Sequence, residues 1–180
     1  MASSLEQLEA SHGVTVRWRS YELRPAGAPP ISPEYLKRIE SSRPQLYATA
    51  KERYGIIMNP GPFGMNSRPV LIGAKYAEHM GKGKEYHANL LNAYWTQAEK
   101  IDDLDNLANH AVAIGLNREA FLAALNDPAY DQEVSDDIQI AAEYGLQGVP
   151  ALIFNDKYYV SGAQPLATLI NVVEKVQSEK

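Results

Sequence analysis

The sequence has 180 residues, of which 45% are hydrophobic and 22% charged, a composition typical of a folded globular protein. Its net charge of −5 is unevenly distributed, because residues 1–90 carry 12 basic against 8 acidic side chains and residues 91–180 carry 5 against 14. The basic side chains are scattered over several segments and the second half is acidic. This pattern argues against a nucleic-acid-binding protein.

The chain contains no cysteine, which excludes disulfides, thiolate nucleophiles and thiolate metal ligands. No apolar run approaches the roughly 18 residues that a membrane span requires. The first ten residues lack the basic and apolar regions of a signal peptide. We therefore expect a soluble cytoplasmic protein with no membrane partner.

The first twenty residues predict a short helix followed by a strand. Ser3 and Glu6 have the spacing of a capping box, apolar residues follow at helical intervals, and Gly13 is a typical helix stop. Residues 14–20 then alternate apolar with polar or basic side chains. This alternation is typical of a half-buried strand, and its arginines suit the edge of a sheet.

The middle of the chain has helical periodicity throughout, beginning at Ser32 and Pro33, which form a typical helix start. Glycine- and proline-containing segments divide the pattern into separate helices. The predicted helices cover about 33–41, 44–54, 67–80, 84–98, 103–114, 118–126 and 130–144. We interpret them as one all-helical insertion at about 33–144.

The C-terminal part predicts a hairpin and a last helix. Two short β-rich runs, ALIF and KYYVS, are joined by Asn155 and Asp156, which tolerate the positive φ angles of a tight turn. An amphipathic helix follows, with Pro165 near its first turn. The order of elements indicates a single α/β domain over residues 1–180 that contains the helical insertion.

Four segments carry a resemblance to a known family: VRWRSYELRP after the first helix, NSR at 66–68, LLNAYWTQAEKIDDLDNLANHAVAIGLN in the insertion, and GVPALIFNDKYYVSGAQP near the end. The chain resembles the DsbA family of the thioredoxin superfamily, in detail its FrnE-like group. The resemblance implies a thioredoxin-like (DsbA-like) α/β fold with an all-helical insertion. It also implies protein disulfide oxidoreductase activity for the group.

The chain departs from that family at its N-terminus. Members of the group begin with a strand and a Cys-Pro-X-Cys-Tyr motif, which by register would lie before Met1, so we expect this chain to begin just past its own active site. The first strand of the usual fold would then be missing from the middle of the sheet. Either its neighbours close up, or another chain supplies a strand, or the native product starts earlier. An exposed edge beside the gap favours a homodimer or another homo-oligomer.

The predicted substrate site is centred on Val149 and Pro150. The resemblance implies a cis bond between them, which turns the N–H and C=O of Val149 toward an extended peptide or a glutathione-like thiol. Ser161 and Gln164 follow the hairpin and could present hydrogen-bonding groups to a substrate; capping of the last helix explains them equally well.

Asn66 and Arg68 resemble a family position that faces the active-site cleft, although a role for Asn66 or Ser67 as a helix cap is the simpler account. No metal site is predicted, because the four histidines lie far apart in the sequence. No catalytic residue is predicted either. We interpret these aspartates as charges at helix starts or facing solvent: Asp102, Asp103, Asp105, Asp136 and Asp137.

The leading interpretation is a DsbA/FrnE-like family member that is redox-inactive as this cysteine-free chain stands, since disulfide exchange requires a thiolate. The first alternative is a kappa-like glutathione-dependent isomerase or transferase, in which glutathione would supply the sulfur. That group holds the thiolate with a serine, but Ser3 and Ser4 lie past the corresponding position. The second alternative is a non-enzymatic module that binds peptides or associates with itself.

Overall fold

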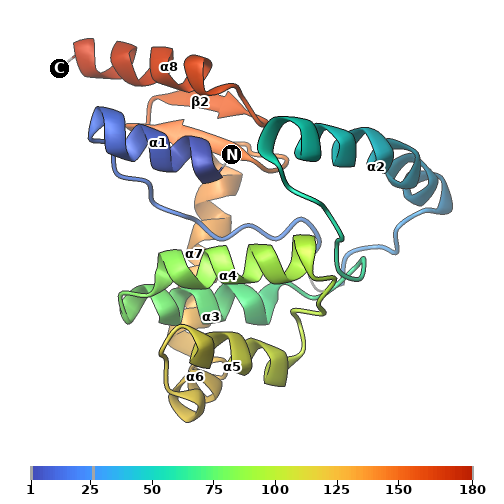
Figure 1. Cartoon of the computed structure of the whole chain (residues 1–180). Helices are drawn as coiled ribbons and strands as arrows, with labels where there is room; N and C mark the ends of the chain where they lie inside the picture. Colours follow the sequence, from blue (N-terminus) through green and yellow to red (C-terminus); the bar gives the residue numbers. More distant parts are fainter. Residues whose placement is uncertain (1, 26, 180) are drawn as a thin grey trace. The chain divides into compact units, whose positions relative to one another are not determined.

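The computed structural model describes residues 2–25 and 27–179, without the side chains of Ala2 and Ser3 (Figure 1). The chain divides into two compact units. Residues 1–23 and 137–180 form one, which we call the α/β unit, and residues 24–136 form the other, which we call the helical unit. Within the described ranges, no helix is both long enough and apolar enough to cross a membrane.

The α/β unit contains a two-stranded antiparallel hairpin, as the sequence predicts. Strand β1 (Ala151–Phe154) pairs with β2 (Tyr158–Ser161) in the register that joins Ala151 to Ser161. Asn155 and Asp156 have φ angles of 47° and 55°, and the Lys157 amide closes the turn on the Phe154 carbonyl at 3.0 Å. The Asn-Asp pair therefore makes the predicted turn, because its short polar side chains tolerate left-handed backbone.

Two helices cover one face of this hairpin. Helix α1 (Ala2–His12) packs against α8 (Leu166–Ser178), and α8 packs against β1 (Figure 1). Four side chains are buried between them, and alternate residues of the strands pack against these four. The buried residues are Leu5, Leu8, Leu169 and Val173, and the strand residues are Leu152, Phe154 and Val160. The period of two along each strand selects this face.

The strand predicted at residues 14–20 does not form. The segment follows α1 as chain without helix or strand structure, although Val14 and Val16 pack against the buried cluster of the α/β unit. The predicted alternation holds for Val14 and Val16 but not for Trp18, which is 37% exposed, and a strand also needs a hydrogen-bonded neighbour. Among the described residues the sheet contains β1 and β2 only.

The capping box predicted at Ser3 and Glu6 is wrong. Helix α1 already includes Ala2, so Ser3 lies inside the helix and cannot be its N-cap. The side chain of Ser3 lies outside the described part of the structure. Ser4, the next residue, is buried within the same helix.

Five helices lie entirely within the helical unit, and α7 (Pro128–Glu143) runs from this unit into the α/β unit. The five are α2 (Pro33–Tyr54), α3 (Arg68–His79), α4 (Gly83–Thr96), α5 (Leu104–Ala113) and α6 (Arg118–Ala124). Their starts follow local sequence signals: Ser32, Asp103 and Asn117 each accept a hydrogen bond from an amide of the first turn.

The prediction of two helices at 33–41 and 44–54 is wrong. A single helix, α2, runs through Pro44 without interruption. A proline removes one donor from the helical ladder. In the preceding turn, the hydroxyls of Ser41 and Ser42 donate to backbone carbonyls three residues earlier, at 2.9 and 2.8 Å. These bonds do not replace the one that Pro44 omits, because the carbonyl that loses its amide donor is that of Glu40, four residues before the proline.

The core of the helical unit is built around aromatic side chains. Tyr86 and Phe121 are almost completely buried, and Tyr76 meets Phe121 edge-on with ring centroids 5.9 Å apart. Gly73 of α3 lies against them, and a Cβ atom there would come within 2.4 Å of the Tyr86 hydroxyl. The close approach of α3 to these rings therefore requires glycine at this position.

Candidate functional site

The open end of the hairpin contains the residues on which the predicted site is centred. The peptide bond between Val149 and Pro150 is cis. The Pro150 carbonyl accepts a hydrogen bond from the Gly162 amide at 2.8 Å, which continues the pairing of the two strands beyond the Ala151–Ser161 pair. Pro150 is thereby fixed to the end of β2, while Val149 precedes the paired region.

Val149 presents an unused main-chain edge. Its side chain is 52% exposed, and among the described residues neither its N–H nor its C=O has a hydrogen-bond partner. Strand β1 pairs with β2 on one side, and no described strand lies on the other. An extended peptide can add to such an edge through main-chain hydrogen bonds, with exposed side chains providing selectivity.

Ser161 and Gln164 lie at the same end of the hairpin, on the β2 side, and are hydrogen-bonded to each other. The Gln164 side-chain amide donates to the Ser161 carbonyl at 2.8 Å. The N-cap of α8 is Pro165, with no side-chain hydrogen bond, so neither residue caps the helix. The capping alternative is therefore wrong for both. Gln164 instead fixes the loop that carries the chain from β2 into α8.

Asn66 acts as a cap, the simpler of its two predicted roles. Its side-chain oxygen accepts from the Arg68 amide at 3.0 Å, and its own amide donates to Asp102 at 3.1 Å. Ser67, the formal N-cap of α3, makes no side-chain bond. The asparagine therefore satisfies one of the free amides at the start of α3.

Arg68 is held by α7 within the helical unit. Its Nε donates to the Asp131 carboxylate at 2.6 Å, and one Nη donates to the Asp131 carbonyl at 2.8 Å and the Ser135 hydroxyl at 2.6 Å. The guanidinium lowers the pKa of Asp131, chiefly through this hydrogen bond. Asn66 and Arg68 are described only within the helical unit, so their role beside Val149 stays a prediction.

The sequence interpretation missed Asp137. We read this residue as a solvent-facing charge, but it is 2% exposed and accepts hydrogen bonds from the Arg19 guanidinium and the Ser20 amide, both at 2.8 Å. The sequence did contain a signal for its burial. Asp137 lies three residues after Val134 and four before Ala141, and both of these residues are buried on the same stripe of α7. A carboxylate in an apolar stripe indicates a buried polar contact.

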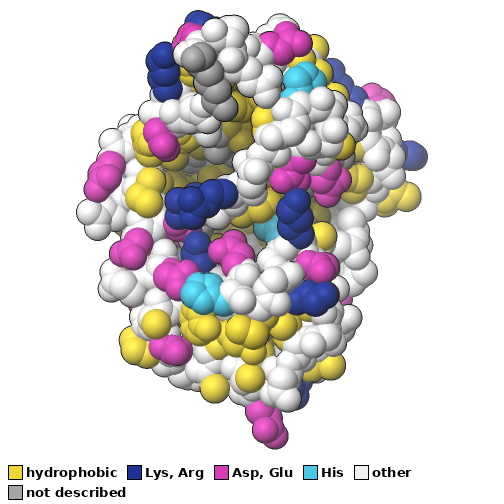
Figure 2. Space-filling view, turned by 90° about the vertical axis from the view of Figure 1, so that its left-hand side faces the viewer, with side chains coloured by type: hydrophobic (Ala, Val, Ile, Leu, Met, Phe, Trp, Pro, Cys, Tyr) yellow, Lys and Arg dark blue, Asp and Glu magenta, His cyan; other side chains and the backbone are white. Residues whose placement is uncertain are grey.

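The arrangement offers binding groups but no nucleophile for thiol chemistry. The chain has no cysteine, and Ser4 is buried inside α1 instead of lying at its start. In the described part of the chain, no three His, Asp or Glu side chains are grouped as metal ligands. On the face drawn in Figure 2, basic and acidic side chains are interspersed, with no continuous basic stripe of the kind that binds nucleic acid.

Comparisons with known proteins place this geometry in a family. Residues 1–174 match the profile described as DSBA-like thioredoxin domain. Among curated proteins, the chain is similar to the uncharacterized protein YwbO of Bacillus subtilis. The two are 25% identical over 164 residues, which cover 86% of this chain and 78% of YwbO.

Solved structures show the same architecture. A probable DsbA oxidoreductase from Streptomyces coelicolor superimposes with a TM-score of 0.85 at 25% identity, over 99% of this chain and 84% of that one. A 2-hydroxychromene-2-carboxylate isomerase superimposes with a TM-score of 0.79 at 24% identity, over 97% and 87% of the two chains. The similarity to the isomerase shows that the two chains share a fold and shows nothing about activity.

Proposed function

Because the chain belongs to the family of DSBA-like thioredoxin domains, we propose that it binds an extended peptide along the main chain of Val149 and does not itself exchange disulfides. The observation that carries this proposal is the unpaired main chain of an exposed Val149 at the open end of the hairpin. The second part of the proposal follows from the sequence. Exchange requires a thiolate that attacks a disulfide sulfur, and the chain has no cysteine.

The binding mode is strand addition. The N–H and C=O of one residue point to the same side of an extended chain, so a peptide residue opposite Val149 exchanges two hydrogen bonds with it. Each such bond contributes about 0.5–1.5 kcal/mol net, so binding by this residue alone is weak and neighbouring side chains must add to it. Pro150 adjoins Val149 and is the first residue that can provide additional contact surface.

Titration calorimetry with a short extended peptide tests the binding. A peptide with unmodified amides should bind, and the same peptide N-methylated at alternate amides should bind about tenfold more weakly because it cannot form the main-chain bonds. Val149→Pro removes the amide donor and should weaken binding similarly, whereas Val149→Thr keeps the donor and the shape. Equal affinities for the methylated and unmethylated peptides would refute strand addition.

Insulin reduction and dithiol oxidation assays test the redox statement separately. The pure 180-residue chain should show no turnover above buffer, because no side chain can form the mixed disulfide. A family member that has both active-site cysteines serves as the positive control. Turnover by the pure chain would show that the proposal is wrong about its chemistry, whatever the peptide titration gives.

Glutathione is the second candidate ligand, because its cysteinyl unit offers the same main-chain groups to Val149 as a longer peptide. The isomerase that shares the fold makes this alternative worth testing. Burial of Ser4 inside α1 counts against a serine-held thiolate. No heat of binding at millimolar glutathione would remove this candidate and leave the peptide.

Self-association through β1 is a further part of the proposal. The edge of β1 that carries no described partner can pair with the same edge of a second copy about a two-fold axis. Sedimentation should then show a homodimer that an added edge-binding peptide dissociates. A monomer at every working concentration would contradict this assembly without affecting peptide binding.

A further inference from the structure

The segment that joins α1 to the rest of the chain, residues 14–20, is organised as a strand although no described strand pairs with it. Apart from Trp18, which is 37% exposed, its even-numbered residues are the part-buried Val14 and Val16 and the buried Ser20. Thr15, Arg17 and Arg19 are exposed. This alternation is that of an extended chain with one face on a core.

Two carboxylates accept hydrogen bonds from main-chain amides on one edge of this segment. The Val16 amide donates to Glu9 Oε1 at 3.1 Å, and the Ser20 amide donates to Asp137 Oδ2 at 2.8 Å. Both amides belong to even-numbered residues, and in an extended chain successive amides point to opposite edges. The carboxylates therefore lie along one edge of the segment. The opposite edge presents the main-chain groups of the odd-numbered residues, and we call it the Thr15 edge.

The Thr15 edge is unpaired in the structure. Among the described residues, the main-chain N–H and C=O groups of Thr15, Arg17 and Arg19 form no hydrogen bonds. The same carboxylates that close the other edge hold the segment in place, because Asp137 is buried on α7 and also pairs with the Arg19 guanidinium. A binding edge that is already ordered loses little conformational entropy when a partner adds to it.

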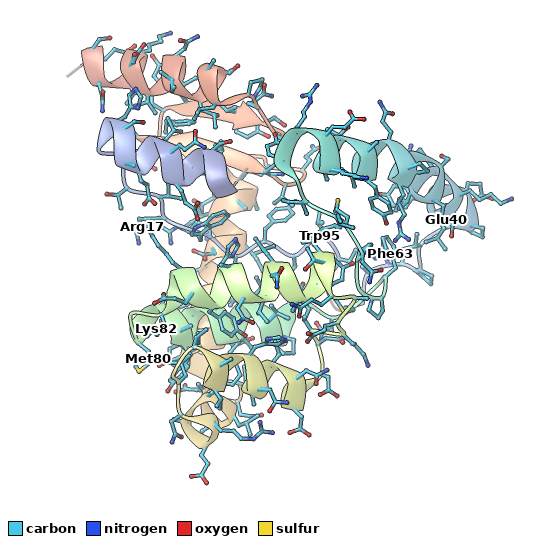
Figure 3. All side chains as sticks on the ribbon, viewed as in Figure 1. Arg17, Glu40, Phe63, Met80, Lys82 and Trp95 are labelled. Atoms are coloured by element: carbon cyan, nitrogen blue, oxygen red, sulfur yellow. The ribbon has the colours of Figure 1, made fainter. Side chains whose placement is uncertain are left out.

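We propose that the Thr15 edge binds an extended acidic segment of a protein partner, added as a β-strand with a carboxylate opposite Arg17. Arg17, labelled in Figure 3, is exposed and has no ion pair within the described residues. The charge of Arg19 is already matched by Asp137. An opposite charge placed directly across a strand pair is favourable, and alternating apolar residues of the partner would extend the face of Val14 and Val16.

A second copy of this chain is a poor occupant of the same edge. The two-fold antiparallel register that pairs all three odd-numbered residues places Arg17 opposite itself and Thr15 opposite Arg19. Like charges directly across a strand pair are destabilising. The charge on the edge therefore selects a different, acidic partner over self-association.

The proposal is independent of peptide binding at Val149, because it depends on other residues and on the positive charge of Arg17. The probes are an acetylated, amidated hexapeptide of sequence Val-Glu-Val-Glu-Val-Thr, its analogue with both Glu replaced by Lys, and an acidic analogue N-methylated at alternate amides. Calorimetry at low salt should show that the acidic peptide binds at least about fivefold more tightly than the lysine peptide. The methylated analogue should bind about tenfold more weakly than the acidic parent.

Variants of the chain then assign the site. Arg17→Glu should reverse the preference, so that the lysine peptide becomes the tighter ligand. Thr15→Pro removes one amide donor from the edge and should weaken binding of the acidic peptide several-fold, while Thr15→Val keeps the donor and should bind like the wild type. Val149→Pro should leave binding of the acidic peptide unchanged, which separates this site from the proposed function.

Each outcome decides the matter. The proposal would be overturned if the acidic and lysine peptides bind equally, or if the methylated peptide binds as tightly as its parent. It would also be overturned if Arg17→Glu leaves the preference unchanged, or if the acidic peptide does not bind at millimolar concentration. If circular dichroism shows that Thr15→Pro does not fold, the charge reversal at Arg17 and the methylated peptide still give a decisive answer.

Discussion

Among the described residues, the helical unit buries ten hydrophobic side chains in a cluster that includes Phe121, whereas the α/β unit buries four in a cluster that includes Leu169. The helices of the first unit satisfy their own main-chain groups, so they need each other only for side-chain packing. The hairpin and the segment at 14–20 cannot do this, because extended chain forms its hydrogen bonds with a neighbour.

This difference explains where the two proposed binding edges lie. Both unpaired main-chain edges, at Val149 and at Thr15, lie in the α/β unit, which has the smaller cluster of buried hydrophobic residues. In the helical unit, charged groups form hydrogen bonds between helices, as Arg68 of α3 does with Asp131 of α7. Variants that act on one unit and spare the other test whether stability and binding are separated in this way.

The largest effect is expected in the core of the helical unit. Phe121→Ala removes a fully buried ring that meets Tyr76 edge-on, and it should lower the free energy of unfolding by about 3–5 kcal/mol. Urea unfolding followed by the fluorescence of Trp95, in a Trp18→Phe background, reports on this unit. Phe63→Ala, at an exposed position, is the control and should cost far less. Similar losses in both variants would contradict the described packing.

The next effect concerns the core of the α/β unit. Leu169→Ala opens a cavity in a cluster of four buried residues and should lower the free energy of unfolding by about 2–5 kcal/mol. Fluorescence of Trp18, in a Trp95→Phe background, should reveal the loss at lower urea than Trp95 does in the reciprocal background. Thr168→Ala changes an exposed neighbour on the same helix. Coincident transitions of the two tryptophans would show that the units unfold as one.

Asp137→Asn should have a smaller effect that is confined to the segment it holds. The substitution removes the charge from hydrogen bonds to Arg19 and the Ser20 amide, and it should cost about 1–3 kcal/mol. Amide hydrogen exchange should show faster exchange of Ser20, and binding of the acidic peptide should weaken with it. Asp136→Asn, at the exposed neighbouring position, should change neither. Unchanged exchange in Asp137→Asn would contradict the buried contact.

The smallest effect is a pH dependence in the helical unit. The Arg68 guanidinium lowers the pKa of Asp131 below its ordinary value of 3.8, so the pair contributes stability above that pH and loses it as the pH falls through the lower pKa. The contribution should stay below about 1 kcal/mol because the carboxylate is half exposed.

An NMR titration of Asp131 checks this direction. The midpoint should rise in Arg68→Gln, which removes the charge, and rise less in Arg68→Lys, which keeps the charge but loses the planar fork. An unchanged midpoint in Arg68→Gln would show that the ion pair does not form in solution.

Most of the fold could be predicted from local patterns. The hairpin depended on the Asn155–Asp156 turn, and the starts of α2, α5 and α6 on a capping residue. The prediction of a break at Pro44 was wrong, because this proline removes one hydrogen bond from a 22-residue helix that continues on both sides of it. The cis bond between Val149 and Pro150 was expected from the family resemblance, whereas the buried contacts of Asp137 were not expected, and the site at Val149 stays a prediction.

The sequence by itself determined most of the helices, the hairpin turn and the absence of cysteine from this chain, because each depends on the identity and spacing of nearby residues or on composition alone. Only the tertiary structure decided that residues 14–20 have no strand partner among the described residues, that Asp137 is buried against this segment, and that Arg68 pairs with Asp131. These features join residues far apart in the chain. The free energy of a hydrogen bond or a buried charge depends on the partner that the fold brings to it, which no local pattern contains.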